Sequence, residues 1–226
     1  MLKYTSLAQL AEEAQSAGAS IGEIVLRDQS LQMERTEDAL LQEMDAQLSI
    51  MEQAAETGAA PDIRSTSGLT GRNGYKMNQY ARTGGVSGAF ATQAIATAIS
   101  VAECNAAMGK IVASPTAGSC GILPGAVITM MRQRGVSRAQ AVLALMAAGG
   151  VGMVIANQAS ISGAEGGCQA ECGSASAMAA AAIVQMAGGT PDMAIHAAAI
   201  AIKNQLGLVC DPVAGLVEVP CVKRNA

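Results

Sequence analysis

Three cysteines occupy settings that suit ligation of a metal ion or an iron–sulfur cluster. Cys168, Cys210 and Cys221 are each surrounded by Gly, Pro, Asp or Glu, which predicts that they lie on turns rather than inside helices. Thiolates on turns can converge on one point. Three of them around a [4Fe-4S] cluster leave one iron without a protein ligand, and that iron can bind a substrate hydroxyl or carboxylate as a Lewis acid. The pattern indicates a catalytic centre rather than an electron carrier.

The other cysteines carry weaker signals. Cys104 lies in an apolar helical stretch and is expected in the core, whereas the roles of Cys120 and Cys172 stay open. The chain has no Cys-x-x-Cys pair, which argues against a four-thiolate zinc site. The first residues carry no secretory signal, so the six cysteines favour free thiols in a reducing cytoplasm over a disulfide framework.

A second candidate site is the turn at residues 114–121, Ser-Pro-Thr-Ala-Gly-Ser-Cys-Gly. It precedes a predicted helix, so its free backbone N–H groups suit a substrate carboxylate. Ser114, Thr116, Gly118 and Ser119 are the candidate substrate-binding residues here, and Ser67, in an earlier Gly-rich segment, is a further one. An ordinary helix cap is the alternative interpretation of this turn.

Acid–base chemistry has few candidates. Lys110, beside the turn, and Glu165, near Cys168, are the predicted catalytic residues. Glu171, on the other side of Cys168, suits an acid–base role or a role as partner of a ligand. His196 is the only histidine and lies in an apolar stretch, so we expect it in the core or at an interface. The chain therefore offers no Ser-His-Asp or Cys-His arrangement.

These groups must be positioned by helices. Half of the residues are apolar but only 2% are aromatic, so small residues must pack elements by close backbone approach. We predict an all-α fold, an Ala/Gly-rich helical bundle with Gly/Pro-rich loops that carry the cluster ligands. Residues 1–60 are expected to form an acidic segment of three helices, and residues 61–226 a helical catalytic domain. Within that domain we predict a long loop over residues 58–88 and helices over residues 88–108, 122–134, 137–156, 175–187 and 190–205.

Charge is divided unevenly between the two segments. Residues 1–60 hold 11 of the 18 acidic side chains and three of the 14 basic ones, which leaves a basic excess in residues 61–226. That excess favours an anionic substrate. There is no basic stripe with interleaved aromatics, so nucleic acid is not an expected partner. The most apolar run, residues 141–156, is shorter than the roughly 20 residues that cross a bilayer, so we predict a buried helix and no membrane span.

One short pattern occurs twice. Ser114-Pro-Thr-Ala-Gly118 resembles Asp211-Pro-Val-Ala-Gly215, and both predict sharp turns that present backbone amides. We interpret them as two related loops that meet at one site, with a chance match of five residues as the alternative.

Four stretches together carry a resemblance to a known family. They are residues 65–71, Ser-Thr-Ser-Gly-Leu-Thr-Gly, and residues 114–121, 159–171 and 207–225. With them the chain resembles the α-chain of the bacterial iron–sulfur-dependent L-serine dehydratase, two-subunit type, over nearly its whole length. The resemblance implies a [4Fe-4S] cluster held by Cys168, Cys210 and Cys221, and conversion of L-serine to pyruvate and ammonia. It implies that the open iron takes the β-hydroxyl, that a base removes the α-proton, and that the amides of residues 118–121 with Thr116 hold the carboxylate.

The resemblance also implies partners. The family has a separate β-chain with an ACT-like regulatory part and a Ser-Ser-Ser-His-Thr motif, which does not occur in this sequence. We therefore expect the chain to work with a β-chain in an oligomer and to be inactive or weakly active alone. Family α-chains continue past the Lys-Arg-Asn motif at residues 223–225, which predicts that this sequence is truncated at its C-terminus.

Two other functions remain as alternatives. Pyridoxal-phosphate-dependent dehydration needs a Schiff-base lysine and a phosphate-binding Gly loop, and no lysine here has a convincing setting. A non-catalytic helical scaffold stabilised by an iron–sulfur cluster or zinc is the alternative from another class.

Overall fold

The computed structural model describes residues 4–226, and the regular elements within them are helices. The α-helices are α1 (Leu7–Ser16), α2 (Ile21–Met33), α3 (Glu37–Gly58), α4 (Asn73–Ala81), α5 (Gly88–Ala106), α6 (Ile122–Arg134), α7 (Arg138–Gln158), α8 (Gly163–Met186), α9 (Pro191–Gln205) and α10 (Glu218–Arg224), with a short 3₁₀ helix, η1 (Ala117–Ser119), before α6. In residues 4–226 the only β pairing is an isolated bridge between Val213 and Leu216. The predicted all-α fold is confirmed.

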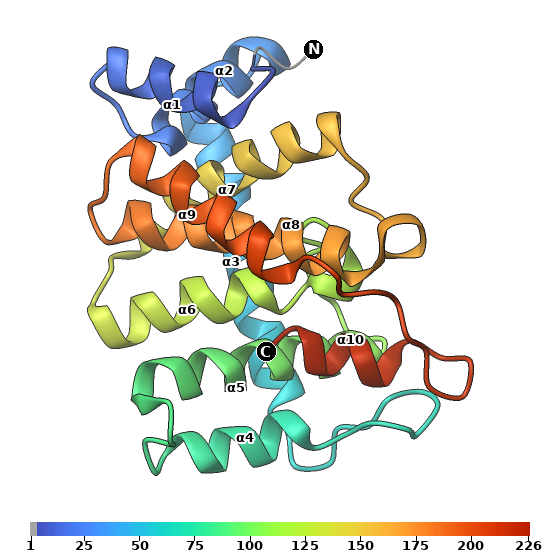
Figure 1. Ribbon diagram of the computed structural model, residues 1–226. Helices are drawn as coiled ribbons and strands as arrows, with labels where there is room; N and C mark the ends of the chain where they lie inside the picture. Colours follow the sequence, from blue (N-terminus) through green and yellow to red (C-terminus); the bar gives the residue numbers. More distant parts are fainter. Residues whose placement is uncertain (1–3) are drawn as a thin grey trace.

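The helices form a stack that α3 crosses (Figure 1). α1 and α2 lie at one end, α7, α8 and α9 in the middle, and α4 and α5 at the other end. α3 runs along the stack and packs against α5, α6 and α7. The short helix α10 lies against α5. One buried apolar cluster contains residues of both predicted segments, such as Leu48 of α3 and Val127 of α6, so the acidic segment shares its core with the rest of the chain.

Helix starts follow side-chain caps that the sequence predicts. The hydroxyl of Ser20 accepts from the Glu23 backbone N–H while the Glu23 carboxylate accepts from the Ser20 N–H, a reciprocal capping box at α2. The Ser6 hydroxyl likewise accepts from the Gln9 N–H at α1, but the side chain of Gln9 accepts from the N–H of Thr5 rather than of Ser6, so the capping box there is incomplete.

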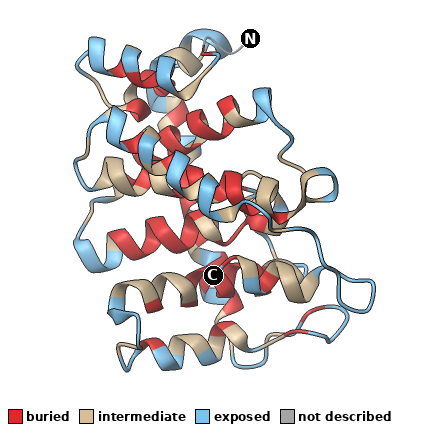
Figure 2. Ribbon diagram, in the orientation of Figure 1, coloured by how far each residue is buried: buried red, intermediate tan, exposed pale blue. Residues whose placement is uncertain are grey.

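Small residues set the distance between helices. Gly58 of α3 lies against the backbone of Ser100 in α5, and Gly22 of α2 lies against the carbonyl of Leu143 in α7. A methyl group at either glycine would overlap these atoms, so close approach replaces large aromatic side chains in filling the core. Figure 2 shows the buried residues concentrated where helices face one another.

The apolar run predicted as a buried helix forms α7. Among the residues that the structure describes, α7 alone is long and apolar enough to cross a membrane. Its most apolar window is 61% buried between other helices, which is typical of a core helix. Eleven of its residues are buried, including Leu145 and Val151.

The predicted loop over residues 58–88 is wrong in part, because it contains α4. The buried carboxylate of Glu103, on α5, accepts from the backbone N–H groups of Asn73 (3.0 Å) and Gly74 (2.8 Å) at the start of that helix. A carboxylate at a helix N-terminus satisfies free N–H groups and opposes the helix dipole. The group that stabilises α4 therefore lies about 30 residues away in the chain, outside any local sequence pattern.

The prediction that all three cysteines lie on turns is also wrong. Cys210 is on a loop, but Cys168 lies in α8 and Cys221 in α10. α8 begins at Gly163 rather than near residue 175, and Gly167, with φ 73° and ψ −174°, kinks it directly before Cys168. The Gly-rich sequence thus produces a kink at Gly167 between two helical segments of α8, with Cys168 directly after it.

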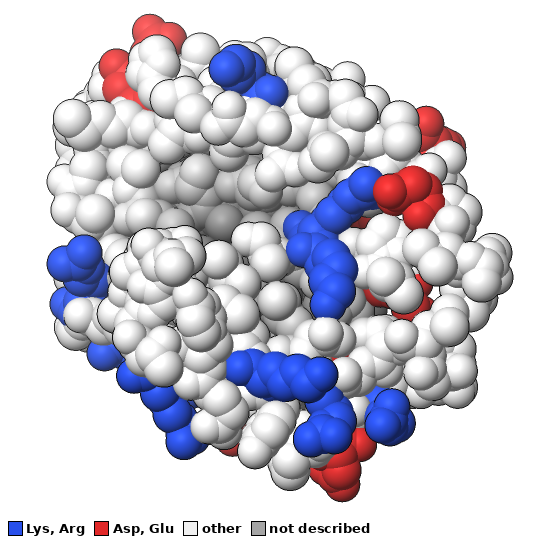
Figure 3. Space-filling model, turned by 60° about the horizontal axis from the view of Figure 1, so that its bottom comes forward, with Lys and Arg blue, Asp and Glu red and all other residues white. Residues whose placement is uncertain are grey.

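Basic side chains gather at the end of the stack that carries α4 and α5. Figure 3 shows Lys and Arg across this face, with acidic side chains mainly toward its edge. Part of the basic excess counted in residues 61–226 therefore lies on this face of the fold.

Candidate functional site

Cys168, Cys210 and Cys221 line one cavity with a volume of about 490 Å³. They reach it from α8, from the loop between α9 and α10, and from α10. The cavity is completed by Thr116, Gly118, Ile161, Ser162, Gly163, Ala164, Glu171, Asp211, Val217 and Pro220. The two loops that share the repeated Pro-x-Ala-Gly pattern both contribute, so their predicted meeting at one place is confirmed.

Gly167 brings the α9–α10 loop onto the kink of α8. A Cβ at this position would lie 2.8 Å from the carbonyl oxygen of Leu208 and 3.1 Å from Cα of Val209. The backbone N–H of Gln169, two residues after Gly167, donates to the same Leu208 carbonyl oxygen (2.8 Å). Glycine is therefore needed both for the positive φ and for the close approach that places the loop beside Cys168.

Arg224 of α10 connects the elements that carry the cysteines. Its guanidinium donates to Sγ of Cys168 (3.0 Å), to the carbonyl oxygen of Val209 (2.7 Å) and to the two carboxylate oxygens of Asp211 (2.7 and 2.8 Å). These contacts raise the pKa of Arg224, with the Cys168 sulfur as the main cause. Since Val209 and Asp211 flank Cys210, Arg224 holds the exposed loop that carries Cys210 against α8.

Asn225 connects α10 to the turn at residues 114–121. Its buried side-chain amide donates to the carbonyl oxygens of Gly118 and Cys221, and its oxygen accepts from the N–H of Gly121, each at 2.7 Å. One side chain thus satisfies three backbone groups and fixes the turn relative to Cys221. The Gly121 N–H that it accepts from is one of the backbone amides predicted to bind the substrate carboxylate.

Glu171 is the carboxylate that faces the three thiols from α8. The hydroxyl of Thr116 donates a short hydrogen bond to it. A Cβ at Gly118 or at Gly163 would lie 2.5 or 2.6 Å from its oxygens, so both glycines leave room for this carboxylate. Glu171 therefore lies beside Thr116 and Gly118, next to the turn that is predicted to bind a substrate carboxylate.

Burial keeps several thiols protonated. It raises the pKa of Cys221 to about 11, with the charge of Glu171 as the next cause. It raises the pKa of Cys172 and of Cys120 to about 12, with neighbouring cysteines as the next cause. Neither Cys120 nor Cys172 lines the cavity. A metal that binds Cys221 must displace its proton, since the thiolate is the ligand.

The donor set fits a cluster rather than a single ion. Within residues 4–226, no three His, Cys, Asp or Glu side chains are placed to hold one metal ion together. The three thiols instead surround a cavity of about 490 Å³, and thiolates are the ligands that iron–sulfur clusters require. The expectation that the sulfurs converge on one point is therefore corrected: they lie around a space.

Two of the five predicted substrate-binding residues, Thr116 and Gly118, line this cavity. Ser114 and Ser119 are buried inside the turn instead. The Ser119 hydroxyl donates to the Ser114 carbonyl (3.4 Å), and the Ser114 hydroxyl is buried without a hydrogen-bond partner. Both serines are placed to shape the turn rather than to face the thiols.

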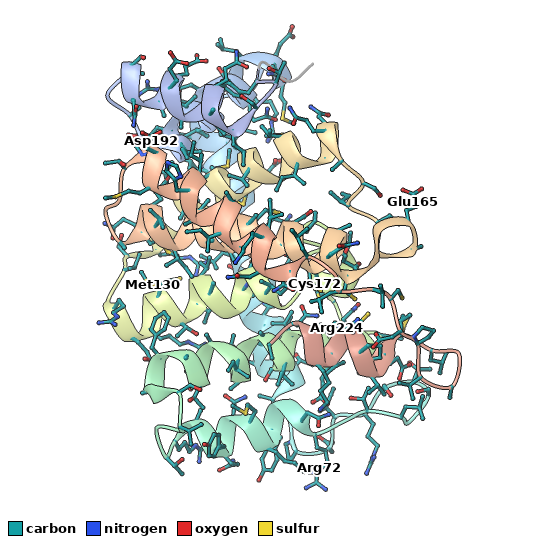
Figure 4. The ribbon with its side chains drawn as sticks, viewed as in Figure 1. Arg72, Met130, Glu165, Cys172, Asp192 and Arg224 are labelled. Carbon is teal, nitrogen blue, oxygen red and sulfur yellow. The ribbon has the colours of Figure 1, made fainter. Side chains whose placement is uncertain are left out.

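The two predicted catalytic residues, Lys110 and Glu165, do not line the cavity. Lys110 is exposed in the segment after α5. Glu165 lies on the exposed first turn of α8, where its carboxylate accepts from the Ser160 hydroxyl (2.7 Å). Figure 4 shows it on an outer turn, away from Arg224. The kink at Gly167 separates Glu165 from the cysteines, whereas Glu171 lies beyond the kink and faces them.

Sequence reasoning missed Arg224 and Asn225 as site residues. Both stand close to Cys221 in the sequence, which is the one signal available. Their partners, however, lie between four and 107 positions away along the chain. No local pattern indicates such contacts, because they exist only once α10 is packed against the turn and the loop.

A second cavity, of about 470 Å³, adjoins the first, and the two share Gly118, Val217 and Cys221. Its remaining lining residues are Thr66, Ala102, Asn105, Ala106, Met108, Ala117, Glu218 and Val222. Ser67, the fifth predicted substrate-binding residue, donates to the carboxylate of Glu218 at 2.6 Å. Ser67 is therefore connected to this second cavity rather than to the first.

A third cavity, of about 280 Å³, lies between α2, α3 and α7. It is lined mainly by apolar side chains, among them Met33, Met44, Met146 and Met153, and by no cysteine. It lacks the groups that the chemistry at the other two cavities would use.

Comparisons with known proteins agree with these observations. A family model described as serine dehydratase alpha chain matches residues 16–226. The probable L-serine dehydratase alpha chain of Bacillus subtilis (strain 168) is 48% identical over 224 residues, which cover 99% of this chain and 74% of the relative. The L-serine dehydratase alpha chain of Peptoniphilus asaccharolyticus is 43% identical over 210 residues, 92% of this chain and 72% of the relative. The L-serine dehydratase TdcG of Escherichia coli (strain K12) is 46% identical over 130 residues, 57% of this chain and 29% of the relative.

Proposed function

Because this chain belongs to the serine dehydratase alpha-chain family, we propose that it is the catalytic subunit of an L-serine dehydratase that uses a [4Fe-4S] cluster. The reaction is the conversion of L-serine to pyruvate and ammonia. The observation that carries the proposal is the meeting of Cys168, Cys210 and Cys221, from three separate segments, around one cavity that also contains Glu171.

Cys168, Cys210 and Cys221 would hold the cluster, and the arrangement of their neighbours supports this role. Arg224 already donates to the Cys168 sulfur and would offset part of the negative charge of three thiolates. When bound, a cluster with three protein ligands supplies one iron as a Lewis acid for the β-hydroxyl of serine.

Glu171 is the residue we assign to the α-proton. It is a carboxylate in the same cavity as the three thiols, and Thr116 and the two flanking glycines fix its position. Removal of the α-proton and loss of the β-hydroxyl as water leave an enamine. The enamine tautomerises and reacts with water to give pyruvate and ammonia without further help from the protein. Lys110 and Glu165 are not needed for this sequence of events.

We propose that the turn at residues 114–121 binds the substrate carboxylate, but with fewer of its backbone amides than the sequence predicts. The N–H of Gly121 is bonded to Asn225, and the N–H of Cys120 donates to the carbonyl of Ala117. We therefore assign the amides of Gly118 and Ser119, in the short helix η1, to the substrate carboxylate.

A partner chain belongs to the proposal, since the similar proteins named above include alpha chains. We expect turnover only when the β-chain is present, in an oligomer of the two. All six cysteines are free, which supports a reducing cytoplasm as the compartment.

Anaerobic reconstitution with iron and sulfide tests the proposal. The chain should gain the broad visible absorbance of a cluster, and pyruvate should form from L-serine after addition of the β-chain. Cys168→Ala, Cys210→Ala and Cys221→Ala should each lower iron and sulfide content and abolish turnover. Cys104→Ala, a buried thiol that lines neither cavity, is the matched control and should keep both.

Other results would select another function. Unchanged iron content and turnover in Cys210→Ala would exclude Cys210 as a ligand. Tightly held zinc, with no effect of serine on the metal site, would support the non-catalytic scaffold. Borohydride trapping of a lysine would support pyridoxal-phosphate chemistry.

A further inference from the structure

The second cavity contains an acidic group whose partners are hydroxyls. Glu218 opens α10 and lines this cavity of about 470 Å³. Its carboxylate accepts from the Ser67 hydroxyl at 2.6 Å. Hydrogen bonds from Ser67 and Ser65 hold the pKa of Glu218 below its ordinary value, and no basic side chain is among the causes. The carboxylate therefore carries its negative charge into the cavity.

Three carboxylates line the two adjoining cavities, and the other two are already engaged. Asp211 forms an ion pair with Arg224. Glu171 is enclosed by Thr116 and two glycines and faces the cysteines. Glu218 accepts from hydroxyls, as Glu171 does, but it lies outside the cysteine-lined cavity, and its donors can rotate or yield when a cation arrives.

An amino acid with a β-hydroxyl presents three polar groups to its enzyme. In the proposed reaction the hydroxyl and the carboxylate are directed to the cysteine-lined cavity and to the amides of Gly118 and Ser119. The α-ammonium group then needs an anionic acceptor close by, because a buried cation without a partner is costly. Gly118, Val217 and Cys221 line both cavities, so Glu171 and Glu218 lie in adjoining cavities that share this wall.

We propose that the cavity lined by Thr66, Asn105 and Glu218 receives the amino end of the substrate, and that Glu218 binds the α-ammonium group. This inference rests on the proposed function. Ser67 then acts as a positioning residue that orients Glu218, not as a direct ligand of the substrate. The buried side chain of Val222 forms an apolar part of the wall of this cavity.

The test compares ligands with and without an ammonium group. L-Serine and its enantiomer D-serine carry it, whereas 3-hydroxypropionate keeps the hydroxyl and the carboxylate but lacks it. The anaerobically reconstituted enzyme with its β-chain is used for KM and inhibition constants. Changes of the cluster absorbance on titration with D-serine and 3-hydroxypropionate give dissociation constants without turnover.

Glu218→Gln should raise KM for L-serine and the dissociation constant of D-serine by about tenfold to a hundredfold, the scale of one hydrogen bond to a charged group. The dissociation constant of 3-hydroxypropionate should stay within about twofold. Glu218→Asp, which keeps the charge, should recover part of the loss. Glu12→Gln, an exposed carboxylate on α1 at the far end of the stack, is the matched control and should change nothing.

Equal shifts for all three ligands, or no shift for any, would overturn the inference. Should Glu218→Gln fail to hold the cluster, Ser67→Ala is measured in the same way. It keeps the carboxylate but removes its 2.6 Å partner, so it should weaken both serines and spare 3-hydroxypropionate. Equal weakening of all three ligands by Ser67→Ala would overturn the inference in that case. A wild-type enzyme without a cluster or without pyruvate formation would instead contradict the proposed function itself.

Discussion

The turn at residues 114–121 and the loop between α9 and α10 share a Pro-x-Ala-Gly pattern and border the same cavity, yet they are built differently. In the turn, Ser114, Ser119 and Cys120 are buried, and Asn225 bonds to the backbone. In the loop, residues 209–217 are all exposed. Arg224 is the side chain that holds the loop in place.

This difference indicates two ways of presenting functional groups. A buried turn is part of the core, so a change in it alters the folding free energy of the whole chain. An exposed loop buries few apolar atoms, so its order depends on a small number of polar contacts. We therefore expect changes in the turn to affect stability and geometry, and changes in the loop to affect mainly cluster binding.

The largest effect is expected for Asn225→Ala. The change leaves the buried Gly121 N–H and the partly buried Gly118 carbonyl without their partner. It should lower the free energy of unfolding by about 2–4 kcal/mol, since each unsatisfied buried group costs about 1–3 kcal/mol. Urea denaturation of the apoprotein measures this loss. A change below about 0.5 kcal/mol would mean that water replaces the amide and that the turn does not depend on it.

Gly118→Ala should mainly affect turnover. The new methyl group would lie 2.5 Å from the Glu171 carboxylate, which must move away from Thr116. Displacement of a reacting group by about 1 Å can cost about a hundredfold in rate. We expect kcat to fall by about that factor while iron content is retained. Normal kcat in this variant would contradict the role assigned to Glu171.

Arg224→Ala should release the loop without unfolding the protein. Loss of contacts to Cys168 and Asp211 should weaken cluster retention by about tenfold or more, as expected for hydrogen bonds to charged groups. Iron loss to a chelator and cleavage of residues 206–217 by protease in the apoprotein measure both effects. Lys223→Ala is the control, because Lys223 donates to Asn73 and not to the loop. If the two variants lose iron at the same rate, Arg224 has no special role.

Gly215→Ala should have the smallest effect. Gly215 occupies the position in the loop that Gly118 occupies in the turn, but no atom lies within 4 Å of its missing Cβ. The constraint at Gly215 is its φ of 77°, a conformation that is strained for alanine. The strain should cost about 1 kcal/mol and stay within the exposed loop. Iron content and kcat should stay near the wild-type values. A loss as large as that in Gly118→Ala would remove the distinction between the two segments.

Much of the fold could be predicted from the sequence because it depends on local signals. The start of α2 follows from Ser20 and Glu23, which are neighbours in the chain and form their capping box without outside help. The small-residue composition likewise predicts close helix packing, as at Gly58. The start of α4 could not be predicted, because its cap, Glu103, comes from another helix.

The residue types of the candidate site could be predicted from the sequence, but the role of each residue could not. Glu165 and Glu171 stand symmetrically about Cys168 in the sequence, and nothing local distinguishes them. The backbone of Gly167 does so, because its positive φ kinks α8 between them, and Glu171 lines the cavity with the thiols whereas Glu165 does not. The position of Glu165 outside the cavity therefore depends on a dihedral angle that the sequence Gly-Gly does not specify.

The sequence by itself determined which groups this protein has for chemistry: three thiols near Gly and Pro, a turn rich in hydroxyls, and few bases. Tertiary structure alone decided which of them meet, because contacts such as Arg224 with Cys168 and Asn225 with Gly118 join distant parts of the chain. Helix caps and apolar periodicity act over a few residues, whereas a cavity forms only where several packed elements leave a space between them.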